Sequence, residues 1–292
     1  MKKKKIFALG FFDGVHLGHQ ALLRICCRLA KEQAAIPAAV TFPLPPSAVL
    51  QNVEPNMITS IVERKKLLHQ YGIEEVRLFP ADTQTLSMEW EEFLELLIAE
   101  GAAGFVCGTD YRFGRFGSGM PENLTAFAAA RNLPCVIVPE QTMDGEKISS
   151  TRIRSLLEVG DVENANRLLG HPHVLTGIVE HGQHLGRTIG IPTANLSLPN
   201  GVLSPAFGVY ACTVQIDSHI YVAVTNIGIR PTVAGKSITV EPWILDFDGD
   251  LYGKELTLSF HKFLRPERKF ADLDALKDQI QRDAAETYQL LK

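Results

Sequence analysis

The spacing of apolar residues changes near residue 170 of this 292-residue chain, and the change requires two kinds of fold. Before it, short apolar runs typical of buried strands alternate with longer segments at helical spacing, as in residues 17–31. Strands that alternate with helices form βαβ units around a parallel sheet. We therefore expect an α/β Rossmann-like domain over residues 1–169.

The second half shows the two-residue alternation of strands joined by tight turns. Residues 209–216 alternate in this way, and residues 217–218 and 248–250 predict hairpin turns. Successive hairpins indicate an all-β antiparallel, Greek-key-like barrel over residues 170–292, with an amphipathic helix at 273–291. Pro242 lacks a backbone donor, so we expect its strand to lie at a sheet edge or to contain a bulge.

Composition and charge narrow the class of partner. The net charge of −4 argues against nucleic acid, and no run reaches the ~20 apolar residues of a membrane span. Five irregularly spaced cysteines without a CxxC predict reduced thiols in the cytoplasm. We expect small-molecule partners, and the sequence leaves the oligomeric state open. One irregular histidine group lacks carboxylates and thiolates, so we expect loop residues rather than a metal site: His171, His173, His181 and His184.

A candidate phosphate-binding turn follows the first expected strand. Residues 12–20 read FDGVHLGHQ, with Phe12 and Gly14 ahead of His16 and His19. A strand-to-helix junction favours anions, and glycine allows a phosphate to approach the backbone closely. Two imidazoles at this spacing can stabilise the charge that develops when a triphosphate is cleaved between its α and β phosphorus. An isolated pair of histidines is more often structural, but the glycine-rich junction favours the catalytic interpretation.

Residues 148–154, ISSTRIR, begin another expected helix. Ser150 and Thr151 can cap it and leave N–H groups for a phosphate. Arg154 can supply a fixed cation for a triphosphate. An ordinary capped helix with exposed arginines is an equally good interpretation of this segment alone.

A second glycine-rich segment runs from Gly186 through Gly190 to Thr193 and Asn195. Its glycines suit nucleotide phosphates, and the neutral oxygens of Thr193 and Asn195 suit the Mg²⁺ that accompanies ATP. No helix is expected after it. From the residues alone, a glycine-rich hairpin is therefore the favoured interpretation.

Taken together, these segments resemble bacterial bifunctional riboflavin kinase/FAD synthetase. FDGVHLGHQ and ISSTRIR are similar to its adenylyltransferase domain, and PTAN at 192–195 is similar to the signature of its riboflavin kinase domain. Residues 108–114, GTDYRFG, resemble the flavin-side loop of that family. The resemblance implies an HxGH nucleotidyltransferase fold that converts FMN and ATP to FAD. It also implies a kinase half that converts riboflavin and ATP to FMN, with Mg²⁺ in both steps.

The resemblance also assigns roles to particular residues. It implies that Glu241 is the carboxylate that activates the ribityl hydroxyl; otherwise an outward-facing strand glutamate is expected. Asp110, Tyr111 and Phe113 are the implied flavin contacts, with core aromatics beside a turn as the alternative. The implied catalytic set is His16, His19, Arg154 and Glu241, and the implied ATP contacts are Phe12, Gly14, Ser150, Thr151, Gly186, Gly190, Thr193 and Asn195.

Two segments depart from the family's pattern. Residues 41–46, TFPLPP, lack its usual acidic residue and histidine, and Trp243 stands where a histidine usually follows Glu241. The first departure makes the adenylyltransferase the weaker half. Two alternatives therefore stay open: a chain in which only the kinase half is active, and a flavin-binding protein without turnover.

Overall fold

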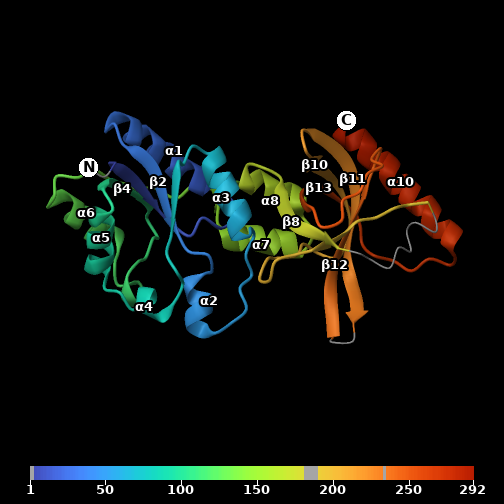
Figure 1. Ribbon diagram of the computed structural model, residues 1–292, viewed down its shortest axis with the longest axis horizontal. Helices are drawn as coiled ribbons and strands as arrows, with labels where there is room; N and C mark the ends of the chain where they lie inside the picture. The colour runs from blue at the N-terminus through green and yellow to red at the C-terminus, as the bar shows by residue number, and fades with distance from the viewer. Residues whose placement is uncertain (1–2, 181–189, 233–234) are drawn as a thin grey trace. The chain divides into compact units, whose positions relative to one another are not determined.

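The computed structural model describes residues 3–180, 190–232 and 235–292, with its elements labelled in Figure 1. Internal contacts divide the chain into two compact units: residues 1–56 with 61–150, and residues 57–60 with 151–292. This division groups residues 151–169 with the barrel. The expected domain boundary after residue 169 stays a prediction.

The first unit is built on a parallel sheet with the strand order β3-β2-β1-β4-β5. This confirms the α/β architecture expected from alternating strands and helices. The strands are β1 (Lys5–Leu9), β2 (Ile36–Thr41), β3 (Glu75–Leu78), β4 (Ala102–Gly108) and β5 (Cys135–Val138).

Helices supply the two hydrophobic cores of this unit because alternate residues of β1 point to opposite faces of the sheet. Ile6 and Ala8 pack in the core that includes α1 and α3, whereas Phe7 and Leu9 pack in the core that includes α5 and α6. The helices are α1 (Leu17–Glu32), α2 (Pro46–Gln51), α3 (Ile61–Gln70), α4 (Thr83–Leu86), α5 (Trp90–Ala99) and α6 (Pro121–Ala129). A short ribbon of β6 (Thr142–Met143) and β7 (Glu146–Lys147) leads to α7 (Ser150–Glu158).

The apolar spacing of residues 87–99 predicts a helix that begins at Ser87, but the structure begins this helix, α5, only at Trp90. The carboxylate of Asp82 accepts the backbone N–H of Thr85 at 2.8 Å and caps α4, and Ser87 ends that helix. The strong cap at Asp82 explains the difference, because it places a helix start upstream of the expected one.

The second unit is an antiparallel barrel that closes in the order β10-β11-β12-β9-β8-β13, as the hairpin pattern predicted. The C-terminal helix α10 contacts β10 and β11, and Arg265 of β13 forms a bidentate ion pair with the buried Asp283 of α10. The elements are α8 (Val162–Leu169), β8 (His173–Glu180), β9 (Asn195–Ser197), β10 (Gly208–Ile216), β11 (His219–Thr232), β12 (Gly235–Ile244), β13 (Glu255–Arg265) and α10 (Leu273–Leu291).

Two expectations about the barrel are wrong. His173 is not a loop residue. It is the first residue of β8, it is buried, and it pairs with Phe260 of β13. Pro242 is not on an edge strand and makes no bulge, because β12 lies between β11 and β9. The carbonyl of Pro242 accepts a hydrogen bond from the Ala194 N–H at 3.0 Å. The strand therefore forms a hydrogen bond here without needing the N–H that proline lacks. His181 and His184 lie outside the described residues.

Candidate active sites

The turn between β1 and α1 has an unusual backbone conformation. Phe12, Gly14 and Val15 all have positive φ angles, of 58°, 74° and 41°. The left-handed region is uncommon for a side chain as large as Phe12 and strained for the β-branched Val15. The side chain of Gln20 donates to the Val15 carbonyl at 3.0 Å and holds the turn in place. The backbone after β1 is therefore fixed before any ligand arrives.

The two histidines of this turn are stacked on each other. Their ring centroids lie 3.7 Å apart with planes inclined by 18°. The backbone N–H of His19 donates to Nδ1 of His16 at 3.3 Å, so His16 caps α1 through Nδ1 and carries its proton on Nε2. Burial, reinforced by the charges of His16 and Arg64, holds the pKa of His19 well below its usual value. His19 is therefore neutral at physiological pH, and the Nε2 of His16 carries an N–H donor.

The structure brings the two predicted phosphate motifs of the first unit together. The hydroxyl of Ser150 donates to the carbonyl of Asp13 at 3.0 Å. Ser150 also lines the same cavity as His16 and His19. Thr151 and Arg154 follow on α7 but belong to the second unit, so their roles stay predictions.

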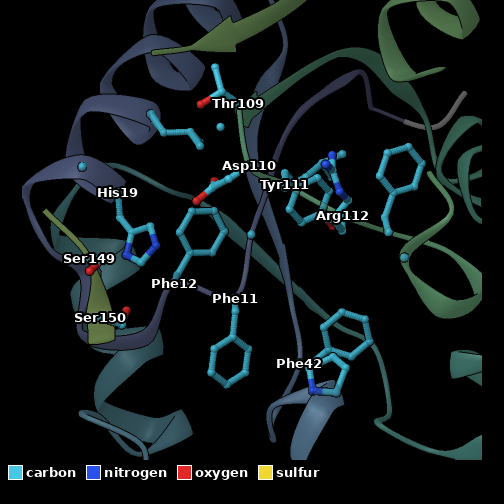
Figure 2. A pocket seen from close by; sticks show the side chains of 18 of the residues that line it. Phe11, Phe12, His19, Phe42, Thr109, Asp110, Tyr111, Arg112, Ser149 and Ser150 are labelled. Atoms are coloured by element: carbon cyan, nitrogen blue, oxygen red, sulfur yellow. The ribbon is translucent and has the colours of Figure 1, made fainter. Parts of the chain in front are cut away.

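This first cavity has a volume of about 520 Å³. Figure 2 shows His19, Ser149 and Ser150 on one side of it. The same view shows Tyr111, Arg112 and Phe42 on the other side. The cavity therefore has a polar end with hydrogen-bond donors and an end with aromatic rings, which matches a ligand that joins phosphates to a planar ring.

The three expected flavin contacts all line this cavity, but they differ in how far other residues already occupy them. The carboxylate of Asp110 accepts a hydrogen bond from Lys147 at 2.7 Å. Tyr111 stacks on Phe113 with centroids 5.6 Å apart. Phe113 is buried and also packs against Phe93, so it belongs to the core as well as to the cavity wall.

Sequence reasoning missed Lys147, a cationic residue of this cavity. It lines the cavity directly before Ile148 and Ser149. Hydrogen bonds to Asp110 and Glu140 raise the pKa of its ammonium. In the sequence, the only feature that pointed to Lys147 was its position directly before the ISSTRIR motif.

Sequence reasoning also missed Arg64, a fully buried cation on α3. It donates to the Phe42 carbonyl at 2.8 Å and lies over the Phe11 ring at 4.1 Å. Burial lowers the pKa of its guanidinium to about 10, although the carboxylates of Asp13 and Glu63 oppose the shift. In the sequence, its burial could have been inferred from its position on the same helix face as Leu67 and Leu68.

The TFPLPP segment still contributes to this cavity. The Thr41 hydroxyl donates to the Phe11 carbonyl at 2.7 Å, which joins the ends of β2 and β1. Phe42 and Pro46 line the cavity, as does Leu50 from α2. The segment therefore forms part of the apolar wall of the cavity, at the place where the family described above usually has an acidic residue and a histidine.

A second cavity of about 450 Å³ lies in the barrel unit. Gly190 and Thr193 line it, together with Pro242 and Ile244 of β12 and the turn at 247–252. Asn195 and Glu241 do not line it. Because strand residues alternate, Glu241 points to the opposite face of β12 from Pro242. Gly186 lies outside the described residues.

The second cavity contains oxygen donors that suit Mg²⁺. Thr193 offers a hydroxyl, and Asp248 and Asp250 add carboxylates from the turn. Among the described residues, no group of three or more His, Cys, Asp or Glu side chains is placed to hold a metal. Within the same residues, no helix is long and apolar enough to cross a membrane.

A parallel α/β unit with a glycine–histidine phosphate turn, followed by a barrel with its own nucleotide-sized cavity, defines a nucleotide-dependent transferase with two sites. A family model for FAD synthetase matches residues 1–152, and one for riboflavin kinase matches residues 169–291. The chain belongs to the family of bifunctional riboflavin kinase/FMN adenylyltransferases.

Individual relatives agree with this assignment. The bifunctional riboflavin kinase/FMN adenylyltransferase of Listeria monocytogenes is 35% identical over 97% of this chain and 91% of its own length. The protein of the same name from Escherichia coli K12 is 36% identical over 95% of this chain and 90% of its own length. A solved Streptococcus pneumoniae structure, described as a macrolide-efflux protein, is 34% identical with a TM-score of 0.89. The match covers 99% of this chain and 95% of that one.

Proposed function

We propose that this chain catalyses both transferase reactions of its family. It phosphorylates riboflavin to FMN with ATP, and it adenylates FMN to FAD with release of pyrophosphate. The observation that carries this function is that the two family models fall on separate parts of the chain, each with its own cavity. Both cavities are of a size that accommodates a nucleotide.

In the adenylyl transfer, a phosphate oxygen of FMN attacks the α-phosphorus of ATP. The bond from that phosphorus to the bridging oxygen breaks, and pyrophosphate leaves. The neutral N–H groups of His16 and His19 donate to the negative charge that develops. Phe12 and Gly14 shape the turn, Ser150 and Thr151 bind phosphate through the start of α7, and Arg154 supplies a cation.

In the kinase reaction, the 5′-hydroxyl of riboflavin attacks the γ-phosphorus of ATP, and ADP leaves. Gly190 leaves room for the phosphates, and the oxygens of Thr193 and Asn195 would hold the Mg²⁺ that ATP carries. When it is bound with ATP, that cation would supply neutralisation of the phosphate charge in either site. Glu241 points to the opposite face of β12 from the cavity-lining Pro242, and the family resemblance assigns it as the carboxylate that accepts the proton of the ribityl hydroxyl.

The reactions place the protein in the cytoplasm, where riboflavin and ATP meet. All five cysteines are free thiols, which supports a reducing compartment. Its partners are small molecules, and neither nucleic acid nor membrane takes part.

A product-separation assay tests the function. The chain is incubated with riboflavin, ATP and Mg²⁺, and flavins are separated over time; FMN should appear first and FAD second. Glu241→Gln should stop FMN formation from riboflavin but leave FAD formation from supplied FMN intact. FMN without FAD in the unaltered chain leaves only the kinase half active. Tight FMN binding without turnover indicates a flavin-binding protein.

A further inference from the structure

The turn at residues 114–118 carries an exposed aromatic ring whose position is costly to maintain. Phe116 is 81% exposed and has φ 52° and ψ 23°, in the left-handed region. A bulky residue in this region destabilises the folded chain. An exposed phenylalanine gains little from its surroundings to offset that cost. Such strain is typical of residues that a site holds ready for a ligand.

The backbone of this turn is clamped on both sides. Phe113 and Gly119 exchange two backbone hydrogen bonds, of 3.1 and 2.8 Å, which close the turn at its base. The N–H of Arg115 donates to the Met88 carbonyl at 2.7 Å. A Cβ at Gly114 would lie 2.6 Å from Trp90, so this glycine permits a close approach that anchors the turn to α5. Phe116 therefore projects from a fixed loop.

The ring is supported from its own turn. The guanidinium of Arg115 lies over it, 5.2 Å from the centroid, and donates to the Glu89 carboxylate at 3.3 Å. A cation above one face of an aromatic ring is attracted by the π system. This contact orients the ring, which stays 81% exposed.

Phe116 also lines the cavity that contains His16, His19 and Ser150. A second exposed apolar side chain, Leu50, which is 57% exposed, lines it too. Exposed apolar groups at a cavity mark a surface that a ligand covers. Because Phe113 packs partly in the core, Phe116 offers the more accessible aromatic face.

We propose that Phe116 is the residue that stacks on the isoalloxazine ring of FMN and selects a planar flavin as the acceptor in adenylyl transfer. This inference rests on the proposed function and adds a specificity residue to it. Leu50 provides apolar contact for the same ring. The phosphate of FMN then extends toward the histidine end of the cavity, where the reaction occurs.

Kinetics with supplied FMN test the proposal. Phe116→Ala should raise the KM for FMN about tenfold, as expected for the loss of one aromatic stacking partner, with kcat little changed. Phe116→Tyr should stay within about twofold of the unaltered chain, because it keeps the ring. Riboflavin phosphorylation by the other unit serves as an internal control for folding and should not change. Val53→Ala is the matched control, because Val53 is 53% exposed and does not line the cavity.

A third variant separates the ring from the backbone strain. Phe116→Asn places a residue that tolerates the left-handed region in the turn, so its thermal midpoint should rise while its KM for FMN rises as in Phe116→Ala. An unchanged KM for FMN in both Phe116→Ala and Phe116→Asn overturns the proposal. If the unaltered chain makes FMN but no FAD, the proposed function fails instead. In that case FMN binding tests the proposal. Phe116→Ala should quench flavin fluorescence less than the unaltered chain does.

Discussion

The imidazole of His19 lies stacked on that of His16, while the His19 backbone N–H donates to the Nδ1 atom of the same ring. His19 therefore packs against the His16 ring and, through its backbone N–H, fixes the tautomer of His16. Burial holds the pKa of His19 well below its usual value, so His19 acts as a neutral donor rather than as an acid.

Replacing His19 by alanine should remove one donor to the developing charge. We expect FAD formation from FMN to fall about 10²- to 10³-fold in kcat, as for other lost donors of this kind. Riboflavin phosphorylation should be unchanged. His69→Gln is the control, because His69 is exposed on α3 and lies outside the cavity lining. Equal loss in both reactions would contradict a role confined to the first site.

Ser150→Ala tests the contact between the two phosphate motifs. Loss of the hydrogen bond to the Asp13 carbonyl should cost about 1 kcal/mol of stability and raise the KM for ATP in FAD formation. Urea unfolding and initial rates measure the two effects. Ser155→Ala is a matched control on the same helix, because Ser155 is exposed and bonds only the Thr151 carbonyl one turn back. The contact is unimportant if the two variants behave alike.

Arg64→Met should change the electrostatics of the histidine pair. Burial is the main cause of the lowered pKa of His19, and the charge of Arg64 lowers it further, so removing this charge should raise the pKa in part. NMR titration of the His19 ring measures the shift, and Arg64→Lys, which keeps the charge, should show much less of it. Removing this cation from beside Asp13 and Glu63 should also destabilise the fold by about 3–5 kcal/mol. A His19 pKa that does not move in Arg64→Met contradicts the coupling.

His173 predicts a stability change with pH. Burial, with a smaller contribution from His171, lowers its pKa to about 3, and neither ring nitrogen has a hydrogen-bond partner among the described residues. Below pH 6.5 the unfolded chain binds a proton that the folded chain does not, so this contribution to stability is complete above that pH. It is lost as the pH falls toward 3, by about 1.4 kcal/mol per pH unit.

Unfolding in urea at pH 7.5 and 5.5 tests this expectation. His173→Leu should lose about 1.4 kcal/mol less than the unaltered chain over this interval, because it has no group to protonate. His219→Gln provides a control at an exposed position in the hairpin between β10 and β11. A similar acid sensitivity in His173→Leu would show that other groups dominate.

Much of the fold could be predicted from local pattern. The periods of the apolar residues predicted the parallel sheet, the barrel and the helix at 273–291 because each element buries one continuous face. The helix α2 was missed because the prolines before it indicate a break, whereas Pro46 occupies the first turn, where its missing N–H costs nothing. His173 was misplaced because its burial depends on pairing with Phe260, a residue far along the chain.

The candidate sites were predictable to the extent that they lie in local motifs. The histidine turn and Ser150 were found, because glycines and caps are visible in short segments. Arg64 was missed because its partners, Phe11 and Phe42, lie in separate segments and meet it only in the folded unit. Phe116 was missed because exposure and backbone conformation follow from the clamped turn rather than from composition.

The paired backbone of Phe113 and Gly119 has a consequence for engineering this protein. It closes the base of the turn, so the tip between Gly114 and Gly119 can be varied while these two glycines and Gly117, which has a φ of 67°, stay in place. Because Phe116 stands at this tip, libraries restricted to it would test which ring systems the first site accepts.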